Sequence, residues 1–303
     1  MQFGVFIGPT AEDIAGVRQR VLAAEQAGFD FVSIQDHPYV PDYLDAFALI
    51  ANLLGSTSTL RFITDVANLP LRPAPMLAKA AASIDRLSNG RFELGVGTGR
   101  AWPQIERMGG PVWTPGQAIG AMSETIDTLR GAWGFEPGNE VGSTPGLSPA
   151  HRIGIWVGGR GPRMLDLIGR KADGWIAPVS TGYETKPAAQ ERIDASAIDG
   201  GRRPGAVGRM IQPVGAVTET PLTTSRPRSG PGNRPIRTTP EHWARFIAEF
   251  AAEERFNAFN FVLESETIDQ VVRFGTEVVP AAKEALAGFS ADGASDAGSL
   301  SRR

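Results

Sequence analysis

An acid and a histidine stand side by side where an apolar segment ends, in the stretch FVSIQDHPYVPDY at residues 31–43. Histidine exchanges a proton near neutral pH, and an adjacent carboxylate can orient the ring or stabilise its charged form. His37 is therefore a candidate acid, base or hydrogen-bond donor, with Asp36 as its neighbour. The alternative interpretation is a histidine with a purely structural role.

Two glycine-rich turns follow other apolar segments and could hold an anion. In GVGTGRAW, at 95–102, backbone amides can approach a ligand and Arg100 adds positive charge, although Arg100 replaces the third glycine of the dinucleotide fingerprint. In GGRGPRM, at 158–164, a helix begins at Pro162, where free N–H groups and the helix dipole favour phosphate. Plain turns with solvated arginines are the alternative.

A further polar pair, Asp65 and Asn68, ends the apolar segment RFITDVANL at residues 61–69. The carboxylate and the carboxamide could bind the polar edge of a ligand. Alternatively, Asp65 could be an ordinary loop carboxylate that caps the next helix. The sequence leaves both interpretations open.

Several kinds of chemistry are excluded or disfavoured. The chain has no cysteine, which excludes disulfides, thiolate zinc sites and thiol nucleophiles. It lacks the G-x-S-x-G, P-loop and H-E-x-x-H motifs, and His151 and His242 have no ligand spacing, so we expect neither a metal nor serine hydrolysis. A net charge of -3 gives no reason to expect nucleic acid or a membrane as partner. Without a signal-peptide pattern or a run of ~18 apolar residues, we expect a soluble cytoplasmic protein.

Strand-length apolar segments alternate with segments of helical periodicity along the chain. The predicted strands are 3–8, 31–35, 61–69, 91–97, 153–159, 174–180, 209–218 and 256–264. The helix after the seventh strand is an example of the periodicity, with Trp243, Phe246, Ile247 and Phe250 on one face. Eight such units predict a (β/α)8 TIM barrel, and a doubly wound open sheet is the alternative. In a barrel, functional residues lie just after the carboxyl ends of the strands.

Three segments fall outside the repeat, within a chain that we interpret as a single barrel domain over residues 1–288. Residues 134–152 are rich in glycine, proline and serine, and we expect them to loop over one end of the barrel. Residues 221–239, PLTTSRPRSGPGNRPIRTT, are rich in arginine and proline and carry no acid, which suggests a mobile lid or a disordered insertion. Residues 289–303 are small and polar, so we expect a frayed tail.

Several motifs together resemble the luciferase-like oxidoreductases, which are (β/α)8 enzymes that use flavin or deazaflavin cofactors. They are IQDHPY, NLPLRPAPMLAKAAASIDRLSNGRFELGVGTGR, GPRMLDLIGRKADGWIAP and FGTEVVP, and the resemblance extends from residue 1 to about residue 288. The resemblance implies that Asp36 and His37 lie beside the cofactor ring, and that a non-prolyl cis peptide joins Asp65 to Val66 behind it. It also implies cofactor contacts from two turns, one with Thr98, Gly99 and Arg100, the other, for phosphate, with Gly158, Gly159, Arg160, Gly161 and Pro162.

One position departs from the family pattern. The sugar-phosphate dehydrogenase of this family has a catalytic glutamate after Thr-Gly, where this chain has Arg100, which puts sugar-phosphate oxidation in doubt. The resemblance implies an oxidoreductase that uses coenzyme F420 to transfer a hydride to or from a small organic substrate. An FMN-dependent monooxygenase fed by a separate flavin reductase is the alternative, and a flavin-binding barrel without catalysis is a second. A homodimer is also implied.

Overall fold

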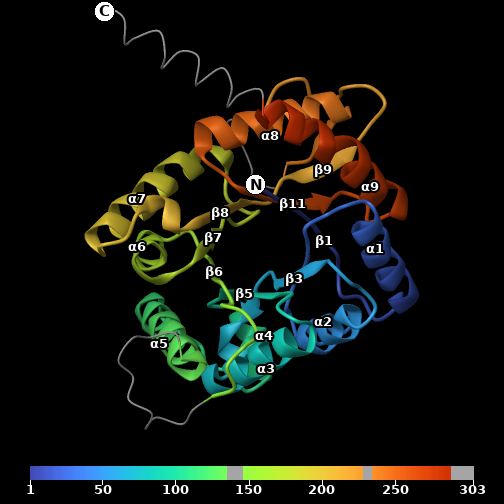
Figure 1. Cartoon of the computed structure of the whole chain (residues 1–303). Helices are drawn as coiled ribbons and strands as arrows, with labels where there is room; N and C mark the ends of the chain where they lie inside the picture. Colours follow the sequence, from blue (N-terminus) through green and yellow to red (C-terminus); the bar gives the residue numbers. More distant parts are fainter. Residues whose placement is uncertain (135–145, 228–233, 288–303) are drawn as a thin grey trace, which may run out of the picture.

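The closed ring of parallel strands is the main feature of the computed structural model, which describes residues 1–134, 146–227 and 234–287 (Figure 1). Each barrel strand pairs in parallel with the next, and the last pairs with the first, so the sheet has no open edge. The barrel strands are β1 (Gln2–Phe6), β2 (Phe31–Ile34), β3 (Arg61–Thr64), β5 (Phe92–Gly97), β6 (Ile155–Gly158), β7 (Gly174–Ile176), β8 (Gly208–Ile211) and β11 (Ala258–Leu263). The predicted (β/α)8 barrel is confirmed, and the open doubly wound sheet is excluded.

Two predicted strands are each divided into two shorter pieces. The segment 61–69 breaks at a cis peptide bond between Asp65 and Val66, after which β4 (Ala67–Asn68) pairs with β5. The segment 209–218 breaks at Gln212 and Pro213, after which β9 (Val214–Val217) pairs with β11. Proline cannot donate to a ladder, which accounts for the second break. Both breaks lie at the carboxyl end of the barrel.

Helices surround the barrel. They are α1 (Ile14–Gln26), α2 (Ala46–Leu54), α3 (Ala74–Leu87), α4 (Trp102–Arg107), α5 (Pro115–Trp133), α6 (Pro162–Lys171), α7 (Lys186–Asp199), α8 (Pro240–Glu254) and α9 (Ile268–Arg273). The start of α5 illustrates how sequence sets these bounds, because Thr114 and Gln117 form a capping box there. Its end is equally local, since Gly134 adopts a left-handed conformation with φ of 75°.

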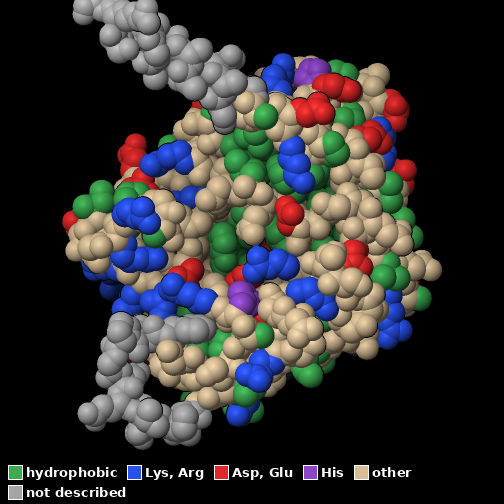
Figure 2. Space-filling view, in the orientation of Figure 1, with side chains coloured by type: hydrophobic (Ala, Val, Ile, Leu, Met, Phe, Trp, Pro, Cys, Tyr) green, Lys and Arg blue, Asp and Glu red, His purple; other side chains and the backbone are tan. Residues whose placement is uncertain are grey.

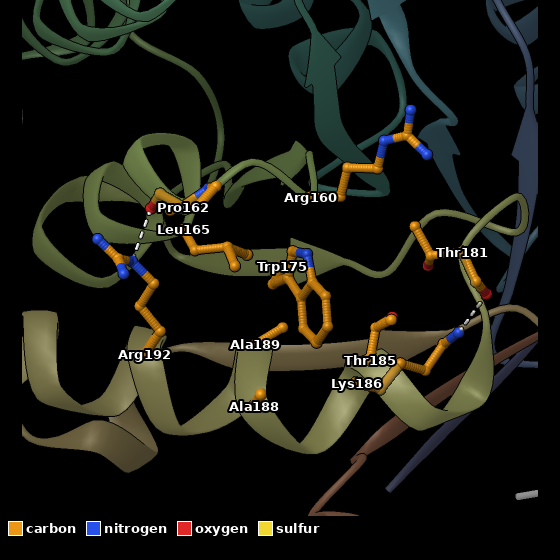
Figure 3. A pocket seen from close by; sticks show the side chains of 10 residues that line it. All are labelled: Arg160, Pro162, Leu165, Trp175, Thr181, Thr185, Lys186, Ala188, Ala189 and Arg192. Atoms are coloured by element: carbon orange, nitrogen blue, oxygen red, sulfur yellow. Dashed lines mark hydrogen bonds between the residues drawn. The ribbon is translucent and has the colours of Figure 1, made fainter. Parts of the chain in front are cut away.

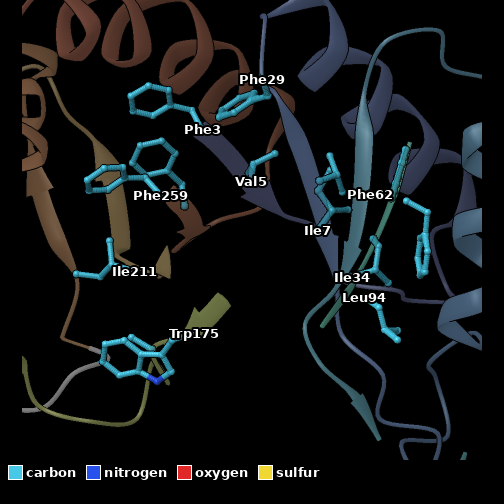
Figure 4. Close-up of a cluster of buried hydrophobic side chains, with 14 of the residues drawn as sticks. Phe3, Val5, Ile7, Phe29, Ile34, Phe62, Leu94, Trp175, Ile211 and Phe259 are labelled. Carbon is cyan, nitrogen blue, oxygen red and sulfur yellow. The ribbon is translucent and has the colours of Figure 1, made fainter. Parts of the chain in front are cut away.

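The main core fills the layer between the strands and the helices (Figure 4). Phe3 of β1 stacks on Phe259 of β11 with ring centroids 5.8 Å apart. The predicted stripe of α8 is fully buried, and its Trp243 packs edge-on against Phe261. Burial of one such side chain contributes about 1.5–3 kcal/mol. The helical periodicity therefore identified the face of α8 that holds it on the barrel.

A second, smaller core lies inside the barrel. It consists of side chains from separate strands that contact one another, namely Phe31, Ile63, Ile176, Met210 and Ala258. Such contacts across a ring of strands are only made through its interior. Figure 2 shows one end of the molecule, with hydrophobic side chains at its centre and charged side chains of both signs intermixed around them.

The described parts of the arginine-rich insertion are ordered, which corrects the expectation of an unstructured segment. Residues Ile236–Thr238 form β10, which pairs in parallel with β9. The side chain of Arg226 is 2% exposed and forms ion pairs with Glu249, Glu253 and Glu254 of α8. This anchor belongs to the last turns of α8, which lead back toward the amino-terminal end of β11. Residues 135–145 of the predicted loop, residues 228–233 and the predicted tail at 289–303 lie outside the described residues.

We expect the Arg226→Met substitution to destabilise the protein by about 3 kcal/mol, since it leaves partly buried carboxylates without their cation. Arg152→Met is the matched control, because Arg152 is largely exposed and pairs with Asp173 at the surface, where such pairs contribute ~1 kcal/mol or less. Chemical denaturation of both variants measures the difference. Equal losses would contradict the role of Arg226 as the anchor of the insertion.

Candidate functional site

The predicted site residues follow neighbouring strands, so the fold brings them to one end of the barrel. Strands β2, β3, β5 and β6 are consecutive in the sheet. The residues that follow them are Asp36 and His37 after β2, Asp65 and Val66 after β3, Thr98, Gly99 and Arg100 after β5, and Gly159, Arg160, Gly161 and Pro162 after β6. Because parallel strands end on the same side, these side chains surround one mouth.

His37 lies half-buried at this mouth. Its ring stacks on Tyr39 with centroids 5.4 Å apart and planes inclined by 18°. Burial lowers the pKa of His37 from its ordinary value of 6.5, Asp36 opposes that shift, and the nearby charge of Arg100 adds to it. His37 is therefore neutral at pH 7. One of its ring nitrogens is a hydrogen-bond donor and the other is a hydrogen-bond acceptor. Its ring makes no hydrogen bond to the residues that the structure describes.

Asp36 makes no hydrogen bond to His37 and instead binds the chain segment that contains Asn68 and Arg72. Its carboxylate accepts two hydrogen bonds from Arg72, each 2.6 Å long, and one of 2.8 Å from the backbone N–H of Asn68. Arg72 also pairs with Asp45 at 2.6 Å and lies over the ring of Phe47. The direct orientation of His37 by its acidic neighbour, which the sequence suggested, is corrected: Asp36 fixes the chain that follows β4.

A layer of polar side chains lies directly beneath the mouth. Side chains in a strand point inward at every second residue. Two positions beyond the apolar interior residues Phe31, Ile63, Met210 and Ala258 stand Ser33, Asp65, Gln212 and Asn260. Asn260 joins this layer, because its Nδ2 donates to Ser33 Oγ at 2.8 Å, to Asp65 Oδ2 at 3.1 Å and to Gln212 Oε1 at 3.3 Å.

Sequence reasoning identified Asp65 but missed Asn260 and Gln212. A signal was present in FNAFNFVLE, where Asn260 interrupts an apolar strand at an inward position. Gln212 offered a weaker signal, because it precedes the proline that divides β8 from β9. Burial in the absence of a cation raises the pKa of Asp65 from 3.8 to about 7.

The glycines at the ends of β5 and β6 make room for Val66. A Cβ atom added to Gly97 would lie 2.4 Å from Val66 Cγ2, and one added to Gly158 would lie 3.3 Å from Val66 Cγ1. The cis peptide bond expected between Asp65 and Val66 is present. Gly158 was predicted as part of the phosphate turn, and in the structure it packs against this valine.

The turn after β5 holds Arg100 at the surface beside His37. Gly99 has a φ of 79°, in the left-handed region where glycine is favoured, and a Cβ atom there would contact Ile105 of α4 at 2.7 Å. Arg100 is exposed, and its charge reaches His37 strongly enough to lower the pKa of the ring. This turn therefore brings positive charge to the mouth.

The turn after β6 is open toward solvent and leads into α6. Gly161 is the residue that precedes the helix, and a Cβ atom on it would meet nothing within 4 Å. The first turn of α6 contains no acid, and Arg160 is exposed. The indole N–H of Trp175 donates to the carbonyl of Gly159 at 2.8 Å and fixes the turn to β7. These features suit an anion at the start of the helix.

A cavity of about 320 Å³ adjoins this turn, between α6 and α7. In Figure 3, Trp175 and Leu165 lie between Arg192 at one end and Lys186 with Thr181 at the other. Lys186 is 3% exposed and donates to the carbonyl of Thr181 at 2.9 Å, and burial lowers its pKa to about 8. The cavity therefore shares Arg160 and Pro162 with this turn.

Within residues 1–134, 146–227 and 234–287, no cluster of three or more His, Cys, Asp or Glu side chains could coordinate a metal. Within the same ranges, no helix combines the length and the apolar character needed to span a bilayer.

The closed barrel, with its polar side chains gathered at the carboxyl ends of neighbouring strands, has the architecture of a (β/α)8 enzyme. A family model described as luciferase-like monooxygenase matches residues 1–255. The chain belongs to this luciferase-like family of oxidoreductases and monooxygenases. The resemblance inferred from the sequence is thereby confirmed.

The relatives and solved structures that resemble this chain differ in their described activities. The chain is 29% identical over 216 residues to 5,10-methylenetetrahydromethanopterin reductase from Methanolobus tindarius, an alignment that covers 68% of this chain and 63% of that protein. The chain thus matches less than two thirds of the length of this relative. An F420-dependent secondary alcohol dehydrogenase, solved with an F420-acetone adduct, superposes with a TM-score of 0.76 at 17% identity, covering 93% of this chain and 98% of the other. The monooxygenase RslO1 from Streptomyces bottropensis superposes with a TM-score of 0.73 at 17% identity. The alignment covers 92% of this chain and 99% of RslO1.

Proposed function

We propose that this protein is an oxidoreductase that uses coenzyme F420 to transfer a hydride to or from a small organic substrate at the barrel mouth. The observation that carries the proposal is the convergence of a neutral, half-buried His37 with an open, basic turn at Gly161, on strands of one mouth. The similarity in fold to an F420-dependent secondary alcohol dehydrogenase supports F420 as the cofactor. The ring of the cofactor supplies the hydride chemistry when it is bound.

The residues of the mouth suit a flavin-type cofactor in three respects. The exposed Arg160 and the start of α6 match a phosphate, and Arg100 adds charge at the next turn. Val66, seated against the glycines of β5 and β6, offers an apolar surface for the face of a ring. His37 is placed to exchange a proton with the substrate or with the cofactor ring. Asp36, the neighbour of His37, is held in place by its hydrogen bonds from Arg72.

A monooxygenase that uses FMN and molecular oxygen, with a separate reductase, is the second candidate. It is favoured by the family description and by the similarity to a solved monooxygenase. Oxygen uptake by the purified protein, measured with reduced F420 and with reduced FMN, distinguishes the two. We expect F420 to support substrate turnover without oxygen uptake. Oxygen uptake with FMN, and no turnover with F420, would replace the first proposal by the second.

We expect the Arg160→Ala substitution to weaken cofactor binding by about 10- to 100-fold, the effect of losing a hydrogen bond to a charged group of ~1.5–3 kcal/mol. Arg170→Ala, at the other end of the same helix, is the control and should leave affinity unchanged, since Arg170 lies in the last turn of α6. Fluorescence titration measures both. An unchanged dissociation constant for Arg160→Ala would remove the phosphate assignment.

The assembly and the location of the protein are further parts of the proposal. The family resemblance implies a homodimer, and a cytoplasmic location is proposed from the sequence pattern alone. An F420 or flavin reductase would supply the reduced cofactor. Sedimentation of the purified protein tests the dimer: a monomer at all concentrations would contradict it.

A further inference from the structure

Two carboxyl groups lie inside the carboxyl-terminal half of the barrel, and their surroundings differ in charge. Asp36 is 1% exposed and is neutralised by the two hydrogen bonds from Arg72. Asp65 accepts a hydrogen bond from Asn260, which also bonds to Ser33 and Gln212, and all three partners in this layer are uncharged. Among the described residues, no Lys, Arg or His forms an ion pair with Asp65. A carboxylate that is largely removed from water and has no cation is costly to ionise, which favours its protonated form.

The hydrogen bonds of this polar layer also leave a place for a proton on Asp65. The amide nitrogen of Asn260 faces three acceptors, on Ser33, Asp65 and Gln212, and carries only two hydrogens. The amide oxygen of Asn260 is buried and has no hydrogen-bond partner within the described residues. A proton on Asp65 supplies the missing donor, either to a neighbouring acceptor or to Asn260 with its amide turned over.

The charged groups on the elements around Asp65 either pair with other residues or are exposed to solvent. After β2, Asp36 is bound to Arg72, and His37 is neutral. After β5 and β6, Arg100 and Arg160 are exposed. Two other acidic groups at the barrel ends are paired: Glu264 after β11 pairs with Arg237, and Glu93 of β5 pairs with Arg61 at the opposite end. Burial is the largest influence on the pKa of Asp65, and the hydrogen bonds of Ser33 and Asn260 oppose it.

Asp65 nevertheless stays accessible from the mouth. Ser33, Gln212 and Asn260 are buried, whereas Asp65 and Val66 keep an intermediate exposure. A ligand in the mouth therefore covers the remaining accessible surface of Asp65.

We propose that Asp65 meets the bound cofactor as a neutral carboxylic acid, so that binding is coupled to proton uptake by this residue. The proposal rests on the proposed function in one respect, that the ligand of the mouth is a flavin-type ring. Covering Asp65 removes water and disfavours its ionised form still further. Above about pH 7 the empty site holds an ionised Asp65, which must gain a proton on binding. Affinity should therefore fall as the pH rises through about 7.

Calorimetric titration of the full chain with F420, and separately with FMN, tests the coupling. Buffers of different ionisation enthalpy report the protons taken up, at about pH 6 and about pH 8. We expect uptake by the unaltered protein near pH 8 and little near pH 6, while the isosteric Asp65→Asn variant shows no uptake attributable to this site. The cofactor's own ionisation cancels in the comparison, because both proteins bind the same ligand.

The same titrations give affinities. From about pH 6 to about pH 8, the dissociation constant of the unaltered protein should rise about tenfold relative to that of Asp65→Asn, since one unit above the pKa corresponds to a factor of ten. Equal pH dependence in the two proteins would overturn the proposal. So would tighter binding by the unaltered protein near pH 8, because it would mean that an ionised Asp65 attracts the ligand. Asp65→Ser serves as a second neutral variant if Asp65→Asn folds poorly.

Infrared difference spectra of the protein without cofactor provide a separate measurement. A carbonyl band of a protonated carboxyl group should disappear as the pH rises through about 7 and should be missing in Asp65→Asn. Absence of this band from the unaltered protein near pH 6 would overturn the proposal. If neither cofactor bound, the proposed function and the coupling would both fail, while the infrared band would still record the protonation of Asp65.

Discussion

The His37→Ala variant should lose about 10²- to 10⁴-fold in kcat and keep its cofactor affinity within a few-fold, as expected when a general acid or base is removed. The reason lies in the position of the ring, which is half-buried at the mouth, neutral, and free of hydrogen bonds to the described residues. Its nitrogens are thus available to a ligand. Steady-state kinetics and cofactor titration, carried out on the same preparation, measure the two effects separately.

The pH profile adds a signature that a structural histidine would not produce. Burial lowers the pKa of His37 below 6.5, so if His37 acts as a base, kcat falls with decreasing pH only below that value. This acidic limb should vanish in His37→Ala. His242→Ala is the control, because His242 lies at the start of α8 and bonds to Thr239. Turnover by His37→Ala at the rate of that control would disprove the assignment.

The Arg72→Met variant should lose about 3–5 kcal/mol of stability, because it leaves Asp36 buried without its cation. The loop that follows β4 should also loosen, since Asp36 bridges Arg72 and the backbone of Asn68. Chemical denaturation measures the loss in stability, and cofactor titration measures the effect on the mouth. Both should be affected, in contrast to Arg226→Met, which acts on the outer insertion.

The double variant with Asp36→Asn and Arg72→Met is the matched control for the ion pair. With the carboxylate neutralised, the second substitution should cost markedly less than it does alone, and the difference is the coupling between the two side chains. Additive losses would show that Arg72 acts through Asp45 or through its packing on Phe47, which it covers at 4.3 Å, and not through Asp36.

The sequence predicted the barrel because its determinants are local. Alternation of apolar strands with periodic helices, such as the buried stripe of α8, gave the fold class and placed His37 and Arg160 at the strand ends. The break of 61–69 into β3 and β4 could not be derived from the residues alone, because a cis peptide bond between two non-proline residues has no signature in residue type. It entered only through the family resemblance.

The partners of the site residues could not be predicted, because they depend on contacts between distant segments. Arg72 lies 36 positions from Asp36, and nothing near Asp36 in the chain marks it as the partner. Asn260 lies 195 positions from Asp65, and a single amide in an apolar strand has many structural explanations. The ion pairs of Arg226 with α8 were missed for the same reason, since low acid content near the insertion said nothing of acids across the fold.

Direct titration of the purified protein with F420 and with FMN tests the central proposal most directly. Saturable binding of F420, stronger than that of FMN and weakened by Arg160→Ala, is the predicted result. Binding of FMN in preference to F420 would contradict the choice of cofactor. Failure of both cofactors to bind would contradict the assignment of the mouth itself.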